Sequence, residues 1–529
     1  MKQLSLFVAV LALTTALQTQ AATREDRDDR RVKHVLLISV DGMHALDLTN
    51  YVASHPNSTL ATLQKHGVTY TNASTSLPSD SFPGLASFVT GGSPVTTGFW
   101  YDVTFNRKLS PPAQTTPLGI PGGANLCPGT IGTQVGYDES IDADLTKIDG
   151  GGSINPAFLP RDPANGCQPV FPHQYMRVNT IFNVARAAGL YTAWTDKHLS
   201  YEWVNGPSNE GVNDFFGPEV NSAVVPLNTP GFDVPRCHTV PDPANTGDWT
   251  KSVLNITCYD ELKVNSVINQ IDGFTHDRSH RAPVPAIFGM NFQSVSVGQK
   301  LKGAGYVDVL GTPSAGLAGD LDFVDQSLGR MVSELKKHGV FDSTLIIIGA
   351  KHGQSPIDPS KRVGIGNGQP ATAIGAAEAF DISDDGSLIW LTDSSLTAQV
   401  VANLSTPAVQ NELGIQEIFA LQSLEEKFNS PLHDERTPDI ILKTNTGVIF
   451  TGGSKIAEHG GFNEDDVHTL LLLSQPGLNA QRIKTPVTNQ QVAPTILRVL
   501  GLDPNALDAV RAERISVLPF FFDGDRDRD

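Results

Sequence analysis

The chain has 529 residues, of which 40% are hydrophobic and 18% are charged, which is the composition of an ordinary globular protein. Its formal net charge is −18 at pH 7. A protein that coats nucleic acid needs a basic face, so this charge argues against that function class, although a local basic pocket stays compatible with it. A chain of this length can bury at least one large core.

The first 22 residues have the layout of a secretory signal peptide. Lys2 precedes an apolar stretch from Leu4 to Leu17, and the small residues Ala21 and Ala22 follow it. This stretch is shorter than the roughly 20 residues that cross a bilayer, so a cleaved signal is favoured over a signal anchor. No later segment is long and apolar enough to be a transmembrane segment, and we therefore expect a secreted, extracellular protein. Glycosylation sequons, relevant only in a eukaryotic secretory pathway, begin at Asn57, Asn72, Asn255 and Asn403.

Four cysteines form an even set, as is common in exported proteins, and none lies in a CxxC pair typical of a structural zinc site. Three connectivities are possible. We expect the pairs Cys127–Cys167 and Cys237–Cys258.

After a mixed-charge segment at residues 23–33, short apolar runs alternate with helical patterns along the chain. Strands are predicted at Val35–Val40, Thr192–Trp194, Ala286–Asn291, Thr344–Gly349, Ile440–Leu442 and Leu470–Ser474, and helices near Leu60–His66, Asn179–Ala188, Phe323–Lys337 and Val492–Leu500. This alternation predicts an α/β fold with a mostly parallel central sheet and helices on both faces.

Two regions interrupt the alternation, at about residues 101–173 and 205–257. Both are rich in Gly, Pro and Asn, and together they hold all four cysteines. Long irregular insertions in a compact domain are usually lids or binding loops, and we expect disulfides to restrain these two. The sequence thus predicts one domain over residues 33–503 and a C-terminal tail over residues 504–529.

Two polar positions indicate chemistry. The run Val35–Val40 ends at Asp41, and a buried strand that ends in a carboxylate places it in the crevice where open α/β sheets bind ligands. Ser81 follows the turn 77–80 and opens an apolar helix-like stretch, where unpaired N–H groups and the helix dipole favour an oxyanion. Either residue also suits a helix N-cap, so a structural role stays open for both. Together they point to chemistry on a small anionic ester.

Five segments, taken in chain order, resemble motifs of the type I phosphodiesterase/nucleotide pyrophosphatase family, part of the alkaline-phosphatase-like superfamily. They are Ser39-Val40-Asp41-Gly42, Leu77-Pro78-Ser79-Asp80-Ser81-Phe82-Pro83 with Val89-Thr90-Gly91, Lys351-His352-Gly353, His459-Gly460-Gly461, and Val492-Ala493-Pro494-Thr495-Ile496 with Leu500-Gly501. The resemblance covers about residues 33–503. It implies an alkaline-phosphatase-like core.

In that family a Thr or Ser nucleophile and two zinc ions hydrolyse phosphodiesters. The resemblance implies that Asp41 matches the metal-binding aspartate of the first strand and that Ser81 matches the nucleophile, which also contacts metal. His352 matches the histidine of the Asp-His-Gly motif, and His459 matches the late His-Gly ligand. Metal coordination would lower the pKa of the hydroxyl group and stabilise the phosphoryl oxygens.

Three positions depart from the family pattern. Lys351 stands where the family has Asp before His-Gly, and Val295 and Gln299 stand where the middle motif has an aspartate and, four residues later, a histidine. Valine cannot bind a metal ion, and a protonated lysine repels one. We therefore expect at most one divalent ion, with zinc the expected element, held by Asp41, Ser81, His352 and His459.

The loss of ligands leaves competing functional interpretations. In the first, the protein is a hydrolase in which Lys351 supplies positive charge, and general-base help, to Ser81. In the second, it is a catalytically inactive relative that binds an anionic ligand, and a third is the conversion of a related ester such as a sulfate or phosphonate. The segment 196–198 follows a predicted strand and suits either a polar wall of the site or a plain loop. The substrate and the oligomeric state stay open.

Overall fold

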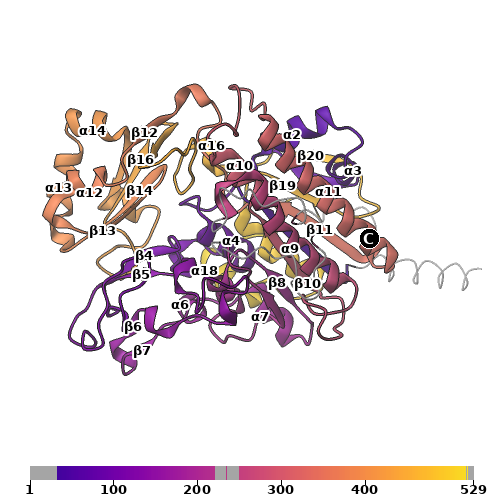
Figure 1. The fold of residues 1–529 in the computed structure, drawn as a ribbon, viewed down its shortest axis with the longest axis horizontal. Helices are drawn as coiled ribbons and strands as arrows, with labels where there is room; N and C mark the ends of the chain where they lie inside the picture. The colour runs from indigo at the N-terminus through magenta and orange to yellow at the C-terminus, as the bar shows by residue number, and fades with distance from the viewer. Residues whose placement is uncertain (1–31, 221–233, 235–236, 238–248, 520, 522–529) are drawn as a thin grey trace, which may run out of the picture.

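The computed structural model describes residues 32–220, 234, 237, 249–519 and 521. A central eight-stranded sheet runs through the molecule, with helices on both of its faces (Figure 1). Its strands, in spatial order, are β20 (Gln481–Ile483), β2 (Gly67–Tyr70), β19 (Leu471–Ser474), β11 (Thr344–Gly349), β1 (His34–Val40), β10 (Ile287–Phe292), β8 (Ala193–Thr195) and β9 (Asp214–Phe216). β19 runs antiparallel to both of its neighbours, and the other neighbouring pairs are parallel. The predicted mostly parallel sheet is confirmed.

The middle strand β1 shows why the sequence forms a sheet buried on both faces. Alternate side chains of a strand point to opposite faces, and here both sets are apolar. Val35 and Leu37 pack in one core layer, and Leu36 and Ile38 pack in the other. The first layer is covered by α4 (Ser81–Thr90), α7 (Ile181–Ala187) and α17 (Val492–Val499), and the second by α2 (Ala45–Ser54), α3 (Thr59–Lys65), α9 (Val253–Ile271) and α11 (Ala315–Lys337).

A second, smaller sheet lies beside the core, in orange at the left of Figure 1. Its strands, β13 (Glu378–Ser383), β14 (Gly386–Leu391), β16 (Ile440–Thr444) and β15 (Ile415–Ala420), are all antiparallel, and α12 (Gln369–Ile374), α13 (Thr397–Leu404) and α14 (Pro407–Leu413) accompany them. The predicted strand Ile440–Leu442 exists but belongs to this sheet. A short apolar run does not reveal which sheet it joins.

The insertions and the tail are more ordered than the sequence predicts. The first insertion contains two small antiparallel ribbons, β4 (Val103–Asn106) with β5 (Thr133–Gly136) and β6 (Arg161–Asp162) with β7 (Gln168–Pro169). The second insertion runs into the long helix α9, which begins at Val253. The segment after residue 503 includes α18 (Asp508–Glu513), where the Glu513 carboxylate accepts hydrogen bonds from Ser93 and Thr96.

Both expected disulfides are present, Cys127–Cys167 and Cys237–Cys258, and no described cysteine is free. Each bridge restrains one of the two insertions, as predicted. We expect titration of the denatured, unreduced protein to find almost no free thiol, because all four cysteines are paired in disulfide bonds. Reduction before the same titration serves as the control and should expose all four thiols. Two or more free thiols without reduction would contradict the pairing.

No helix among the described residues has the length and apolarity to cross a membrane. The predicted signal peptide, residues 1–22, lies outside the described residues. Of the four sequons, the one at Asn255 is unsuited to carry a glycan, because this side chain is 1% exposed within α9.

Candidate active site

Four neighbouring strands of the central sheet bring polar side chains to one edge. β11, β1, β10 and β8 are parallel, so their carboxyl ends meet at the same side of the sheet. Asp41 follows β1, Asn291 is the penultimate residue of β10, Lys351 and His352 follow β11, and Asp196 follows β8. Sequence analysis identified three of these five residues as site residues and left Asp196 undecided.

Ser81 begins helix α4, which faces this edge. Asp80 is the N-cap, and its Oδ1 accepts a hydrogen bond of 3.1 Å from the Phe82 N–H. Gly84, one turn into the helix, lies against the backbone after β11: a Cβ at this position would come within 2.0 Å of the Lys351 carbonyl oxygen. Only glycine permits this close approach, which brings the start of α4 to the end of β11.

Asp41 is fully buried and is held by three hydrogen bonds. Asn291 Nδ2 donates to Oδ2 at 2.9 Å, Gln293 Nε2 donates to the same oxygen at 2.5 Å, and Ser39 Oγ donates to Oδ1 at 3.1 Å. Burial acts to raise the pKa of Asp41, but the surrounding positive charges, that of Lys351 foremost, lower it well below its ordinary value. The carboxylate is therefore ionised at neutral pH.

Two fully buried lysines neutralise the carboxylates at this edge. Lys351 Nζ lies 2.8 Å from Asp196 Oδ1 and 3.8 Å from Asp41 Oδ2, and it also sits 4.3 Å from the ring centre of Tyr201. Lys263, from α9, lies 2.9 Å from Asp260 Oδ1 and donates a hydrogen bond of 3.0 Å to Asn291 Oδ1. Lys351 thus lies at the candidate site, as the sequence predicts. Lys263, which the sequence does not indicate as a site residue, is a second buried lysine there.

A third lysine contacts the serine itself. Lys197 Nζ donates a hydrogen bond of 3.4 Å to Ser81 Oγ. The side chain of Lys197 is half-buried, whereas Ser81 is 2% exposed. Burial acts to lower the pKa of Lys197, but Asp102 and other nearby carboxylates raise it overall, so this side chain is an ammonium group. The described contacts of the Lys351 ammonium are with Asp196, Asp41 and Tyr201, so Lys197 is the lysine that reaches the hydroxyl group.

The rings of His352 and His459 pack against each other, with centroids 3.8 Å apart and planes tilted by 31°. Nδ1 of His352 donates to the Gly353 carbonyl at 2.8 Å, which leaves Nε2 facing Asp41 Oδ2 at 3.8 Å. Nδ1 of His459 lies 3.3 Å from the Oδ2 of Asp80. Burial lowers the pKa of His352 to about 4 and that of His459 well below its ordinary value, so both imidazoles are neutral at pH 7.

The two replaced positions of the middle motif serve the packing of the protein. Val295 is fully buried in the core layer beneath β1. Gln299 Nε2 donates hydrogen bonds of 2.9 Å to the Gly42 carbonyl and 2.8 Å to the Tyr306 hydroxyl group. Neither residue supplies a metal-binding carboxylate or imidazole to the site.

The donors present do not fit a preformed metal centre. In the described part of the chain, His, Cys, Asp and Glu donor atoms lie within 4.8 Å of one another as a group of three at Asp272, Glu334 and His338. That group lies elsewhere and is already paired with Arg278 and Lys337. Asp41, His352 and His459 do not form such a group, and the Lys351 ammonium lies beside Asp41.

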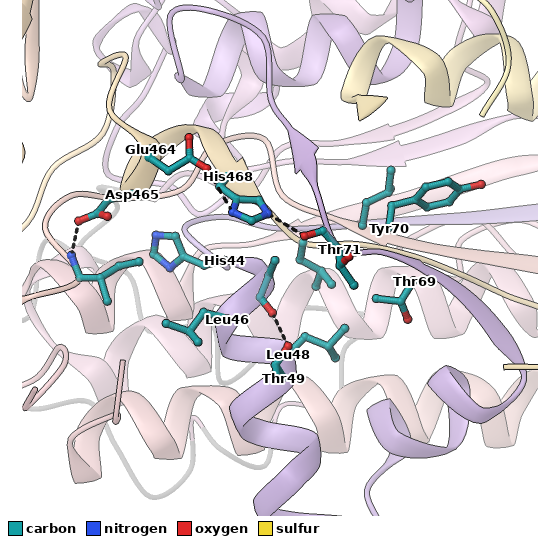
Figure 2. A pocket seen from close by; sticks show the side chains of 14 residues that line it. His44, Leu46, Leu48, Thr49, Thr69, Tyr70, Thr71, Glu464, Asp465 and His468 are labelled. Atoms are coloured by element: carbon teal, nitrogen blue, oxygen red, sulfur yellow. Dashed lines mark hydrogen bonds and ion pairs between the residues drawn. The ribbon is translucent and has the colours of Figure 1, made fainter. Parts of the chain in front are cut away.

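A separate cavity of about 370 Å³ lies between α2 and the segment formed by α16 (Glu464–Val467) and β18 (His468–Thr469) (Figure 2). Two histidines, His44 and His468, line this cavity, and their ring nitrogens already have partners in the protein. His44 contacts Asp47, Tyr306 and the Gln354 backbone, and His468 contacts Thr71 and Glu464. The lining includes none of the predicted site residues.

The mostly parallel sheet, the serine at a helix start and the polar strand ends belong to an alkaline-phosphatase-like fold. The chain matches the family described as Type I phosphodiesterase / nucleotide pyrophosphatase over residues 35–117 and 183–467. It belongs to this family, whose description denotes hydrolases of phosphodiester and pyrophosphate bonds.

Individual relatives are distant. The chain is 21% identical over 189 residues to the bis(5'-adenosyl)-triphosphatase ENPP4 of Pongo abelii, and this match covers 34% of the chain and 38% of the relative. Murine ENPP5 is 12% identical with a TM-score of 0.54, and the alkaline phosphatase PafA is 14% identical with a TM-score of 0.58. Each match covers 89% of this chain and 96% of the solved chain, and at these identities they show the fold alone.

Proposed function

We propose that this protein is a secreted hydrolase of phosphodiester or related anionic ester bonds, with Ser81 as the nucleophile. The observation that carries the proposal is the setting of its hydroxyl group: Ser81 lies at the N-terminus of α4, and its Oγ is 3.4 Å from the Lys197 ammonium. Both features stabilise negative charge on the serine oxygen and on a bound ester. Family membership supports the same reaction class.

The proposed reaction has two steps, formation of a covalent ester on Ser81 and its hydrolysis by water. Ser81 Oγ forms a bond to phosphorus while the bond from phosphorus to the leaving alcohol breaks, and the hydroxyl proton ends on that alcohol. Water then cleaves the seryl ester, which restores the hydroxyl group and releases a phosphate monoester. Lys197 stabilises the charge that develops on the oxygens, and Lys351 contributes a fixed positive charge 3.8 Å from Asp41 Oδ2. Any divalent ion is limited to one, with Asp41, Ser81, His352 and His459 as its candidate ligands.

The alternative is an inactive relative that binds a small anionic ligand in the same place. One contact favours it: the Lys197 ammonium donates a hydrogen bond to Ser81 Oγ and, because it has no lone pair, cannot accept the hydroxyl proton as a general base. A complex of AMP with an inactive variant of murine ENPP5 is an example of such a ligand in a protein of similar fold.

The test is turnover of a chromogenic aryl phosphodiester by the purified protein. We expect release of the aryl alcohol at a rate proportional to enzyme concentration, and a slower or absent release from the matching aryl monoester and aryl sulfate. Faster release from the sulfate would assign the protein to sulfate esters. If none of the three is cleaved although phosphate binds, the binding alternative replaces the hydrolase.

A further inference from the structure

The charges around Asp41 are balanced by the chain itself. Lys351 lies 2.8 Å from Asp196 and 3.8 Å from Asp41, and Lys263 lies 2.9 Å from Asp260. All five residues are fully buried. Each of these three carboxylates therefore already has a lysine as its cationic neighbour. A metal centre, by contrast, requires carboxylates whose negative charge is not already neutralised by side chains.

A divalent ion at Asp41 would also have to share that carboxylate with the Lys351 ammonium. Asp41 Oδ2 already accepts hydrogen bonds from Asn291 and Gln293, and Oδ1 accepts one from Ser39. An ion bound to these oxygens would lie close to the ammonium group in a buried environment, where like charges repel strongly. Three of the roughly four acceptor positions of the carboxylate are therefore already used by side chains of the protein.

Positive charge nevertheless reaches the place where an ester must bind. An ester attacked by Ser81 Oγ brings its non-bridging oxygens within a few ångströms of that atom. Lys197 Nζ is 3.4 Å from Ser81 Oγ, and its side chain keeps partial exposure, so it can turn from the serine to a bound oxygen. The Lys351 ammonium lies deeper, 3.8 Å from Asp41 Oδ2, and offsets the negative charge of that carboxylate.

We propose that the lysines of this site replace the metal ions: the protein binds a tetrahedral oxyanion at Ser81 through the Lys197 ammonium, with Lys351 balancing Asp41 and Asp196, and requires no divalent ion. This inference deepens the proposed function and, for turnover, rests on it. The proposed function allows up to one divalent ion. The present inference goes further, because it assigns the whole positive charge of the site to lysine side chains of the protein.

The experiment treats the full-length secreted protein with a zinc-selective chelator, measures its metal content, and compares phosphate binding and aryl phosphodiester turnover before and after. Inorganic phosphate is the probe, followed by titration calorimetry. We expect substoichiometric metal, unchanged phosphate affinity and unchanged turnover after chelation. Loss of phosphate binding or of turnover after chelation, with recovery on adding zinc, would overturn the inference and leave the hydrolase proposal standing. If phosphate binding is unchanged by chelation but no turnover is seen before chelation, after it or with added zinc, the hydrolase proposal is refuted and the lysine-based binding site stands.

A variant tests the role of Lys197 directly. Lys197→Met should weaken phosphate binding on the order of tenfold or more, because a charge-assisted hydrogen bond is lost, while Lys197→Arg should keep most of it. Lys65→Met removes the same charge from an exposed lysine of α3 and should leave the affinity unchanged. If Lys197→Met folds with a normal circular dichroism spectrum and binds phosphate like the wild type, Lys197 is not the binding group. If Lys197→Met fails to fold, the phosphate affinity of Lys197→Arg and of the wild type is measured at increasing salt concentration instead. An affinity that does not depend on salt in either protein would refute binding by a charged side chain.

Discussion

Replacing Ser81 with alanine is expected to reduce hydrolysis of an aryl phosphodiester by a factor on the order of 10³ or more, because a covalent nucleophile is removed. Phosphate affinity should stay largely intact, since Lys197 and the N-terminus of α4 remain in place. Turnover and phosphate titration on the same preparation separate the two effects.

Ser87→Ala is the matched control. Ser87 lies in the same helix, is fully buried, and donates a hydrogen bond of 2.7 Å to the Gly84 carbonyl, so its loss tests damage to α4 without removing the nucleophile. We expect a modest loss of thermal stability and turnover close to that of the wild type. If Ser81→Ala retains wild-type turnover, the nucleophile is a different residue.

Replacing Lys351 with aspartate is expected to have the largest effect on stability. The change places a negative charge beside Asp41 and Asp196, which then lack their buried partner, and breaking a buried ion pair costs about 3–5 kcal/mol. The new carboxylate also lies next to Asp41 and His352 and matches the family pattern at this position. Added zinc should therefore raise the melting temperature of Lys351→Asp and leave that of the wild type unchanged.

Lys361→Asp makes the same chemical change at an exposed position and controls for net charge. Its melting temperature should stay near that of the wild type with or without zinc. A zinc response of equal size in Lys351→Asp and the wild type would show that Lys351 does not keep metal out. A Lys351→Asp protein as stable as the wild type would show that the buried pairs contribute nothing.

The parts of the fold that are local in sequence could be predicted. The apolar runs that become β1 and β11, and the serine after the turn at residues 77–80, are visible without the structure because each is a short pattern with its own signal. The second sheet could not be predicted, since its strands are short apolar runs like those of the core, and pairing partners are set by contacts distant in sequence.

The candidate site was predicted in part for the same reason. Asp41, Ser81 and His352 stand at ends of elements, where a polar residue after an apolar run is conspicuous. Lys197 follows β8 and offered the same signal, although the sequence alone did not separate a site residue from a plain loop. Lys263 gave none, because it lies inside α9, where a lysine is usually on the solvent face. Its buried position depends on Asp260 and Asn291, neighbours that only the folded chain supplies.

Helix α9 carries both one end of a disulfide bond and a buried ion pair of the candidate site. Cys258 lies in this helix two residues before Asp260 and one and a half turns before Lys263, and its bond to Cys237 fastens the second insertion there. The bridge is thus attached to the helix that supplies the Asp260–Lys263 ion pair. Lys263 of this helix donates a hydrogen bond to Asn291, and Asn291 in turn donates one to Asp41. Reduction of this bond would release the link between Cys237 and α9, so the two sides of the bridge would then be held by packing alone.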